Sequence, residues 1–343
     1  MAMDSVAGEA GAVLVGALDG SAITKVEETF FRRAQFSGVT LFKRNIPDDL
    51  AETSALTQSI QNLNTSTDAP LLIAIDQEGG RVSRLRGHPF PDEGPAMELA
   101  GGKSDDEALQ QIRSYGETIG ESLLRLGINT NFAPVVDILT EPVNTAIGDR
   151  AFGTDVDPVC DRAGAFLGGM QAKGVLGCLK HFPGQGDAKV DTHEGTATVD
   201  LPAKMLNDRE LVPFRALLNK TAMVMISHCV YPSLDSVEAS RSPKIIGGLL
   251  RGEMGFRGAV VSDDMVMGAM PSDEKAWQEA IVESLMAGAD LILVCQHLDK
   301  CRMAHDAIVR AAQKSKPVRM RLAEACEYVM GVRKQLSPAT MIN

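Results

Sequence analysis

The feature that most constrains the fold is a set of eight short apolar runs that recur along the chain. These runs lack the strict polar–apolar alternation of a strand with one face in water. Such runs are typical of strands buried on both faces, as in parallel sheets. They cover residues 12–18, 39–42, 71–75, 129–136, 175–179, 223–226, 259–261 and 290–294.

Helical patterns lie between most of these runs. Leu109, Ile112, Ile119 and Leu123 follow helical spacing, and Gly127 is suited to end that helix. Further helices are predicted over residues 158–173, 243–255, 274–288 and 318–335. Strands that alternate with helices in this way predict an α/β fold, and eight of them predict a single (β/α)8 TIM-type barrel. An open doubly wound sheet is the alternative.

No linker or change in composition divides the chain, so residues 1–343 are predicted to form one domain. The formal net charge is −11, which disfavours binding to nucleic acid or to an anionic membrane. The N-terminus lacks the basic segment of a signal peptide, and no apolar run is long enough to cross a bilayer. The six cysteines are scattered without a CxxC motif, so we expect a reduced, cytoplasmic protein without a structural zinc site.

Charged side chains gather where the predicted strands end. In a (β/α)8 barrel the active site lies at the C-terminal ends of the strands. Each of these residues has an ordinary structural interpretation when it is considered alone, such as a helix cap or a hydrogen-bonded core histidine. Their grouping at one end of the barrel indicates a site, and the set comprises Asp76, Asp137, Lys180, His181, His228 and Asp263.

The stretch at 180–200 carries the strongest local signal. Lys180 and His181 follow an apolar run, and glycines then break regular structure. Asp191 and His193 are two residues apart, so an extended backbone would place both side chains on the same side. An Asp beside a His can orient the ring and support its charged form, which suits an acid/base pair.

These residues fit a retaining glycoside hydrolase, although they do not require one. Asp263 follows a buried strand and could attack an electrophilic carbon, while Asp191 and His193 could supply and recover a proton. The acid/base in such enzymes is usually a second carboxyl group, so a His in that role is unusual. A Lys at a strand end also suits Schiff-base chemistry, and grouped His and Asp also suit a divalent metal.

The motifs resemble those of glycoside hydrolase family 3 β-N-acetylhexosaminidases of the single-domain, bacterial peptidoglycan-recycling type. The resemblance spans roughly residues 11–300, and its longest motif is specific. The segments that carry it are GVTLFKRN at 38–45, IDQEGGRVSRLR at 75–86, NFAPVVDI at 131–138 with AIGDRAFGTD at 146–155, KHFPGQGDAKVDTH at 180–193 and GFRGAVVSDDMVMGA at 255–269.

The resemblance implies a role for each matching residue. Asp263 matches the nucleophile, His193 the general acid/base, and Asp191 its partner in the dyad. Residues that match those holding the N-acetylglucosamine ring are Asp76, Arg84, Arg150, Lys180 and His181. Supporting roles are expected for Arg81, Asp137, His228 and Asp264, and Glu78 is expected to pair with a nearby Arg.

The implied activity is removal of terminal β-linked N-acetylglucosamine from peptidoglycan fragments, including 1,6-anhydro muropeptides, without a metal or other cofactor. The expected partners are saccharides containing N-acetylglucosamine, and neither nucleic acid nor a membrane is expected. A family 3 β-glucosidase, a non-catalytic sugar-binding barrel, a Schiff-base aldolase and a metal-dependent hydrolase remain as alternatives. Oligomeric state and the preferred aglycone are left open by the sequence.

The chain departs from the family pattern at three places. Gln185 replaces the His of the family's PGHG motif, so we expect altered hydrogen bonding in this loop. Thr192 replaces a Ser and keeps the hydroxyl. The segment after the nucleophile, MVMGAM, lacks the polar Ser and Glu of the family pattern, which changes the expected wall of the pocket.

Overall fold

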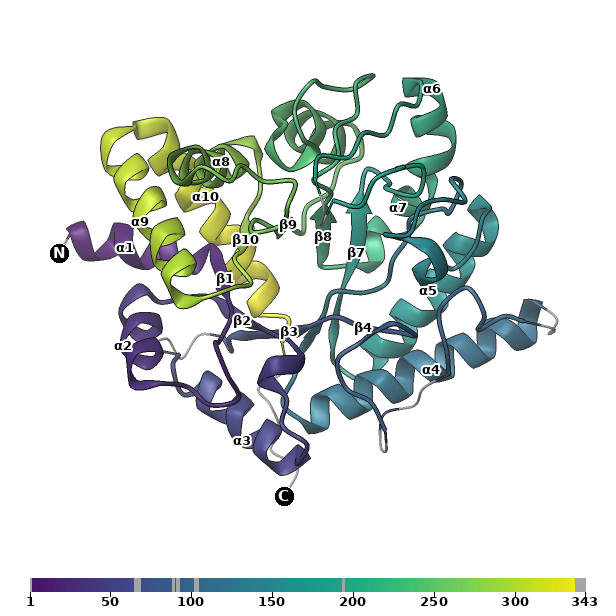
Figure 1. Ribbon diagram of the computed structural model, residues 1–343, viewed down its shortest axis with the longest axis horizontal. Coiled ribbons are helices and arrows are strands. Elements are labelled where there is room, and N and C mark those ends of the chain that lie inside the picture. The colour runs from purple at the N-terminus through teal and green to yellow at the C-terminus, as the bar shows by residue number, and fades with distance from the viewer. Residues whose placement is uncertain are drawn as a thin grey trace.

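A computed structural model describes residues 2–64, 69–87, 90, 93–101, 105–192 and 195–336. Eight parallel strands close into a barrel in the order β1-β10-β9-β8-β7-β6-β3-β2, surrounded by helices (Figure 1). The predicted (β/α)8 barrel is therefore confirmed. The barrel strands are β1 Leu14–Gly16, β2 Gly38–Leu41, β3 Leu72–Ile75, β6 Thr130–Asn131, β7 Leu176–Phe182, β8 Met223–Ile226, β9 Ala259–Asp264 and β10 Leu291–Leu293, and a separate antiparallel pair comprises β4 Gln77–Gly79 and β5 Val82–Ser83.

Every predicted apolar run contains a barrel strand, but three boundaries were wrong. The run at 129–136 yields only two strand residues, because Pro134 has no N–H to continue the ladder. Beyond it, Val135 forms an isolated bridge with Lys180. In contrast, β7 continues through Lys180 and His181, and β9 continues through Asp263 and Asp264. These polar residues are part of the strands and do not end them.

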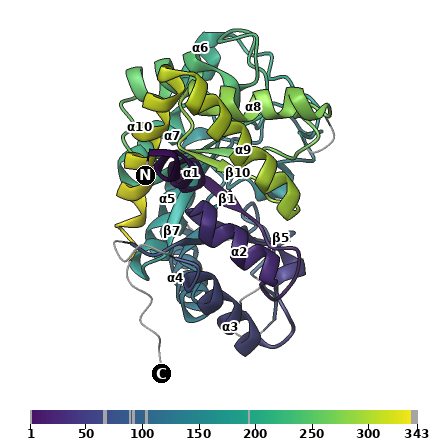
Figure 2. The same ribbon diagram turned by 90° about the vertical axis from the view of Figure 1, so that its left-hand side faces the viewer.

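Helices cover the outside of the barrel, and the predicted helices are present within a few residues, except that the segment predicted over residues 243–255 is π-helical. The helix α1, before the first strand, was not predicted. Figures 1 and 2 show α1 beside α9 and α10. The carbonyl oxygen of Ala7 accepts a hydrogen bond of 3.0 Å from His305 Nε2, and Glu9 binds Arg319. The helices are α1 Ala2–Ala12, α2 Lys25–Ala34, α3 Leu50–Gln61, α4 Asp105–Arg125, α5 Val156–Ala172, α6 Ala203–Met205, α7 Val212–Leu217, α8 Glu274–Ala287, α9 Leu298–Lys314 and α10 Lys316–Arg333.

Short helical turns connect several of these elements. The 3₁₀ turns are η1 Lys43–Asn45, η2 Gly148–Arg150, η4 Leu218–Lys220 and η5 Ala239–Arg241, and the wider π-helical segments are η3 Leu206–Glu210 and η6 Lys244–Glu253. Of the described helices, none is both long enough and apolar enough to cross a membrane.

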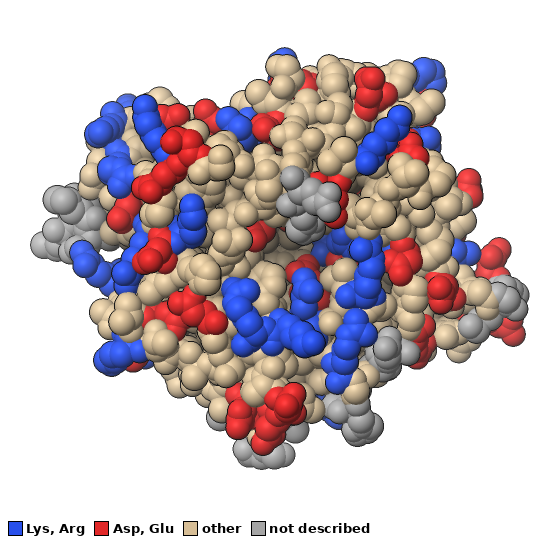
Figure 3. Space-filling model, in the orientation of Figure 1, with Lys and Arg blue, Asp and Glu red and all other residues tan. Residues whose placement is uncertain are grey.

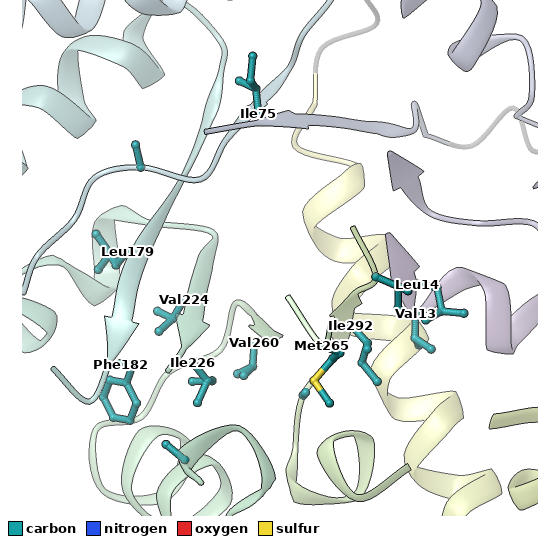
Figure 4. Packing of buried hydrophobic residues seen from close by; sticks show 14 of the residues in the cluster. Val13, Leu14, Ile75, Leu179, Phe182, Val224, Ile226, Val260, Met265 and Ile292 are labelled. Carbon is teal, nitrogen blue, oxygen red and sulfur yellow. The ribbon is translucent and has the colours of Figure 1, made fainter. Parts of the chain in front are cut away.

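Two apolar clusters explain why the strand runs are continuously hydrophobic. On β8, Val224 and Ile226 pack in the outer cluster between strands and helices (Figure 4). Met223 and Met225 belong to the second cluster, which lies inside the barrel. Successive side chains of a strand point to opposite faces, so both faces of the strand must be apolar. Near the N-terminal end of β3, Arg333 of α10 donates to the carbonyl oxygens of Ala69 and Pro70. Apolar side chains thus fill the barrel interior.

Candidate active site

A cavity of about 240 Å³ opens at the C-terminal ends of the strands. Figure 3 shows a hollow near the middle of this face, with Lys and Arg side chains gathered along one side. The cavity brings together six of the predicted site residues, namely Asp76, Arg84, Arg150, Lys180, His181 and Asp263. The acid/base candidate His193 lies outside the described residues, and its partner Asp191 is not among the residues that line the cavity.

Asp263 is a buried carboxylate near the end of β9. Its Oδ1 accepts a hydrogen bond of 2.8 Å from the backbone N–H of Asp264. Burial alone would raise the pKa of Asp263, but the nearby rings of His181 and His228, that N–H and the Lys180 ammonium together hold the pKa below its usual range. The carboxylate is therefore ionised at neutral pH.

Asp264 lines the same cavity in a different electrostatic state. Burial raises the pKa of Asp264 to about 7, and the adjacent charge of Asp263 adds to this effect. Its Oδ1 accepts hydrogen bonds from the backbone N–H groups of Val266 at 3.2 Å and Cys295 at 3.0 Å. These bonds oppose the rise and fix the side chain against the ends of β9 and β10. Of the two neighbours, Asp263 is the better candidate for an ionised nucleophile.

A buried ion network forms one wall of the cavity. Lys180 Nζ lies 2.9 Å from Asp76 Oδ1 and 2.6 Å from Glu78 Oε1. Glu78 also accepts two hydrogen bonds from Arg150, of 2.8 Å from Nε and 2.9 Å from Nη2. Arg84 Nη2 lies 3.4 Å from Asp76 Oδ2. The expected pairing of Glu78 with an Arg is present, and Glu78 itself lines the cavity, which the sequence did not indicate.

Opposite charges in this network outweigh the effect of burial on each pKa. Burial raises the pKa of Glu78, but the charges of Arg150 and Lys180 outweigh it and hold that pKa well below its usual range. Burial lowers the pKa of Lys180, but Asp76 and Glu78 outweigh it and raise that pKa above its usual value. Lys180 is thus an ammonium ion and not the free amine that Schiff-base formation requires. This electrostatic environment disfavours the aldolase alternative.

His181 is held by a buried carboxylate. Asp137 Oδ2 lies 2.7 Å from His181 Nδ1, and both Asp137 oxygens accept the backbone N–H of His181. The ring is oriented with its other nitrogen available, and His181 lines the cavity. His228 does not line it: its Nδ1 lies 2.7 Å from Ser240 Oγ and its Nε2 lies 3.1 Å from the carbonyl oxygen of Asp264. Burial lowers the pKa of His228, and its ring hydrogen-bonds to the backbone of β9 at Asp264.

Several cavity residues are apolar and were not predicted. They sit at strand ends or just after Asp264, where an apolar side chain looks the same in sequence as one in the core. Phe42 is one of two phenylalanines among them, and the guanidinium carbons of Arg44 and Arg84 lie 4.8 and 5.6 Å from its ring centre. The others include Val82, Phe132, Met225, Met267, Leu293 and Cys295.

The described part of the chain contains no group of three or more His, Cys, Asp or Glu residues arranged to hold a metal ion. The buried carboxylates instead have Lys, Arg, His or backbone N–H groups as partners. What the cavity offers is an ionised carboxylate surrounded by hydrogen-bonding side chains, with apolar walls. This arrangement suits a small polar ligand such as a sugar ring.

Comparison with known proteins agrees with this chemistry. The glycosyl hydrolase family 3 N terminal domain matches residues 5–341. The β-hexosaminidase of Nitrosomonas eutropha is 34% identical over 288 residues, which cover 82% of this chain and 79% of that protein.

Solved structures of similar fold include a β-N-acetylglucosaminidase of the same family. A family 3 β-N-acetylglucosaminidase from Paenibacillus sp. str. FPU-7 matches with a TM-score of 0.87 and 30% identity. The match covers 98% of this chain and 65% of that protein, so this chain spans about two thirds of that relative's length. NagZ from Neisseria gonorrhoeae, solved in complex with N-trifluoroacetyl-D-glucosamine, matches with a TM-score of 0.78 and 27% identity over 94% of this chain and 98% of that one. The match over nearly the whole chain shows that this protein is a glycoside hydrolase that belongs to glycosyl hydrolase family 3.

Proposed function

We propose that this protein is a retaining exo-β-N-acetylglucosaminidase. The observation that carries the proposal is the ionised, buried Asp263 at a cavity lined by Asp76, Arg84 and Lys180. At about 240 Å³ the cavity is smaller than the roughly 300–1,000 Å³ of sites for drug-sized ligands. This size suits one terminal sugar unit, and hence exo action.

In the first step, an Asp263 oxygen attacks the anomeric carbon of a terminal β-linked N-acetylglucosamine. The bond to the leaving oxygen breaks, and His193 donates a proton to that oxygen, which departs as an alcohol. In the second step, His193 takes a proton from water, and the water oxygen displaces Asp263 with net retention. Asp191 orients the ring of His193 and stabilises its protonated form.

The buried network holds the sugar. Asp76 and Lys180 present an acceptor and a donor to the cavity, which suits recognition of vicinal hydroxyl groups. Among the described residues, Arg150 donates three of its five N–H groups to Glu78 and to the carbonyl oxygen of Ala146, which leaves two for a ligand. Because these groups are already paired and buried, they need little rearrangement when the substrate enters.

The natural substrates we propose are peptidoglycan fragments, among them 1,6-anhydro muropeptides, in cell-wall recycling. Arg44 and Arg84 flank Phe42 beside the cavity, which places positive charge where an acidic aglycone would lie, although the whole chain carries −11. All six cysteines are free thiols, which supports a reduced, cytoplasmic setting. We further propose that residues 1–343 act as one catalytic domain.

Hydrolysis of a chromogenic β-N-acetylglucosaminide beside the matching β-glucoside tests the proposal, with wild type and Asp263→Ala. Turnover of the first substrate alone, lost in a variant whose melting temperature is unchanged, is the expected result. Turnover of the glucoside instead would keep the reaction but overturn the sugar. Binding of N-acetylglucosamine without turnover of either substrate would favour a non-catalytic sugar-binding barrel. Proton NMR of the first-formed anomer checks retention.

A further inference from the structure

The sugar cavity has two unlike halves. The half formed by β3, β6, β7, β8 and the residues after them contains every described Lys, Arg and His that lines the cavity, namely Arg84, Arg150, Lys180 and His181. The half formed by β9, β10 and β2 begins at Asp263 and contributes no cationic side chain from the described residues. It is lined by Thr40, Phe42, Asp264, Met267, Leu293 and Cys295. Ligand groups in this second half must therefore be bound by carboxyl, hydroxyl or apolar side chains.

Asp264 offers one oxygen to this half. Its Oδ1 accepts hydrogen bonds from the backbone N–H groups of Val266 and Cys295, so the position of the carboxyl group is fixed. Its Oδ2 has no hydrogen-bond partner among the described residues, and the side chain is partly exposed where it lines the cavity. Burial raises the pKa of Asp264 to about 7, so at pH 6 the carboxyl group carries a proton and can donate a hydrogen bond.

Thr40 provides a second polar group, from β2. The residue is 1% exposed, and its Oγ1 has no hydrogen-bond partner of ordinary geometry among the described residues. The thiol of Cys295 lies near enough for the Thr40 hydroxyl to lower its pKa slightly, but a thiol is a weak hydrogen-bonding group. Thr40 lines the cavity although its Oγ1 is buried, so a ligand would reach this oxygen after rotation about χ1 between staggered positions. A buried hydroxyl without a partner costs folding free energy, and a ligand hydroxyl would supply the missing bond.

The two halves suit the two groups that flank the reacting carbon of N-acetylglucosamine. The anomeric carbon is bonded to C2, which carries the acetamido group, and to the ring oxygen, beyond which C5 carries the hydroxymethyl group. With the anomeric carbon at Asp263, where the halves meet, one of these groups falls in each half. The acetamido carbonyl oxygen suits the half in which Arg150 keeps two N–H groups for a ligand. The hydroxymethyl group, a methylene with a single hydroxyl, suits the half with Asp264, Thr40 and the apolar Leu293.

We propose that Asp264 and Thr40 form the subsite for the hydroxymethyl group of the terminal sugar and determine the selectivity of the enzyme at C6. The inference rests on the proposed N-acetylglucosaminidase function and adds two specificity-determining residues to it. The Asp264 carboxyl group donates a hydrogen bond to the C6 oxygen, and the C6 hydroxyl donates to Thr40 Oγ1. A sugar that lacks this hydroxyl leaves both groups without a partner, which lowers kcat/KM by about 5- to 150-fold.

The test measures kcat/KM at pH 6 for 4-methylumbelliferyl β-N-acetylglucosaminide and for its 6-deoxy analogue. The wild type should prefer the parent substrate by about 5- to 150-fold. Thr40→Val and Asp264→Ala should each lower this preference several-fold, and the double variant should abolish it. Because the two substrates are compared within one variant, general damage to the site affects both alike and does not change the preference.

Two control variants make the outcome decisive. Asp264→Asn keeps an acceptor for the two backbone N–H groups and supplies a neutral donor, so it should retain the preference for the 6-hydroxyl. Thr53→Val is the matched control for Thr40→Val and should leave the preference unchanged. Thr53, in α3, is also buried, its hydroxyl has no partner among the described residues, and it does not line the cavity. Thr40→Val preserves the shape of the side chain, so it carries the test if Asp264→Ala does not fold.

Two results would overturn the subsite alone. One is turnover of the parent substrate with the same preference for the 6-hydroxyl in wild type, Thr40→Val and Asp264→Ala. The other is a changed selectivity between the acetamido substrate and its 2-propanamido analogue without any change at C6, which would put the acetamido group in this half. Turnover of the parent substrate by the wild type tests the proposed function separately. Its absence in folded wild-type protein would overturn the function and the subsite together.

Discussion

Replacement of Glu78 by Gln is the sharpest test of the buried ion network. Glu78 is 6% exposed and contacts two cations, Arg150 through both carboxylate oxygens and Lys180 at 2.6 Å. The amide of Gln keeps one acceptor but carries no charge. Lys180 retains Asp76, whereas Arg150 loses the partner that takes two of its N–H groups. The variant therefore leaves the buried guanidinium of Arg150 without its hydrogen-bonded carboxylate partner, although Asp137 and Asp76 still contribute negative charge nearby.

The size of the expected loss in stability follows from the burial of the Glu78–Arg150 pair. Removing one partner of a buried ion pair costs about 3–5 kcal/mol of unfolding free energy. Unfolding entropy near 2.1 cal/mol/K per residue gives roughly 0.7 kcal/mol per kelvin for 343 residues. The expected fall in melting temperature is thus about 4–7 °C.

The assay is thermal unfolding followed by calorimetry at pH 7, with Glu121→Gln as the matched control. Glu121 binds Arg125 at 2.5 Å on the surface of α4, with about half of each side chain exposed, so the same substitution there should cost at most about 1 kcal/mol, or about 1.5 °C. A fall in Glu78→Gln no greater than that of the control would refute the reasoning, because it would show that the cations of the cavity wall do not depend on Glu78.

The pH dependence provides a second check on the same variant. The pKa of Glu78 is lowered in the folded protein from an ordinary value of 4.5, so its stabilising contribution is complete above that value. As the pH falls below about 4.5, the wild type gradually loses the contribution and the difference between wild type and Glu78→Gln should shrink. A difference that stays constant from pH 7 to pH 3 would mean that packing, not charge, causes the loss.

Three other predictions follow from the site and its loop. In steady-state kinetics on methyl β-N-acetylglucosaminide, Asp191→Asn should lower kcat by about 10²–10⁴-fold with little change in KM. Equal kinetics of the variant and the wild type would exclude the Asp191–His193 dyad. Asp264→Asn should gain melting temperature relative to wild type as the pH rises from about 4 to about 7. Over that range Asp264 keeps its proton in the folded wild type but loses it in the unfolded chain, whose pKa is the ordinary 3.8, so the wild type loses stability and the variant does not. A difference in melting temperature that does not change with pH would contradict the raised pKa. Gly186→Ala should lower the melting temperature by several degrees because the new Cβ would lie 1.6 Å from the carbonyl oxygen of Ile138, whereas Gly20→Ala, with nothing within 4 Å, should not.

The sequence predicted the barrel well because its strands are buried on both faces. It misplaced the ends of β7 and β9 for a related reason. Polar residues after an apolar run usually lie outside the strand, but here the last residues of these strands line the cavity. Lys180, His181 and Asp263 can therefore remain in the ladder while their side chains face polar surroundings.

Helix α1 was missed because its stability is not local. Its residues carry no clear apolar stripe, and its described partners, His305 and Arg319, are some 300 positions further along the chain. Contacts at that separation arise only once the barrel closes. The same limit applies to Gln185, whose partners Ser227 and Thr192 come from another strand and from the far side of its loop. The replacement of the family's His by Gln185 was visible in the sequence, but the hydrogen-bonding partners of Gln185 were not.

The adjacent carboxyl groups Asp263 and Asp264 show how position decides chemistry. Both are buried, so burial pushes both pKa values upward. Asp263 lies near His181 and Lys180, and these groups reverse that effect. Asp264 is held by the N–H groups of Val266 and Cys295, which do not suffice to reverse it. Two like charges side by side are costly, so ionisation of the first favours the proton on the second. The order of the two residues on β9 therefore makes Asp263 the ionised carboxylate, as the proposed nucleophile must be, and Asp264 a group that can hold a proton beside it.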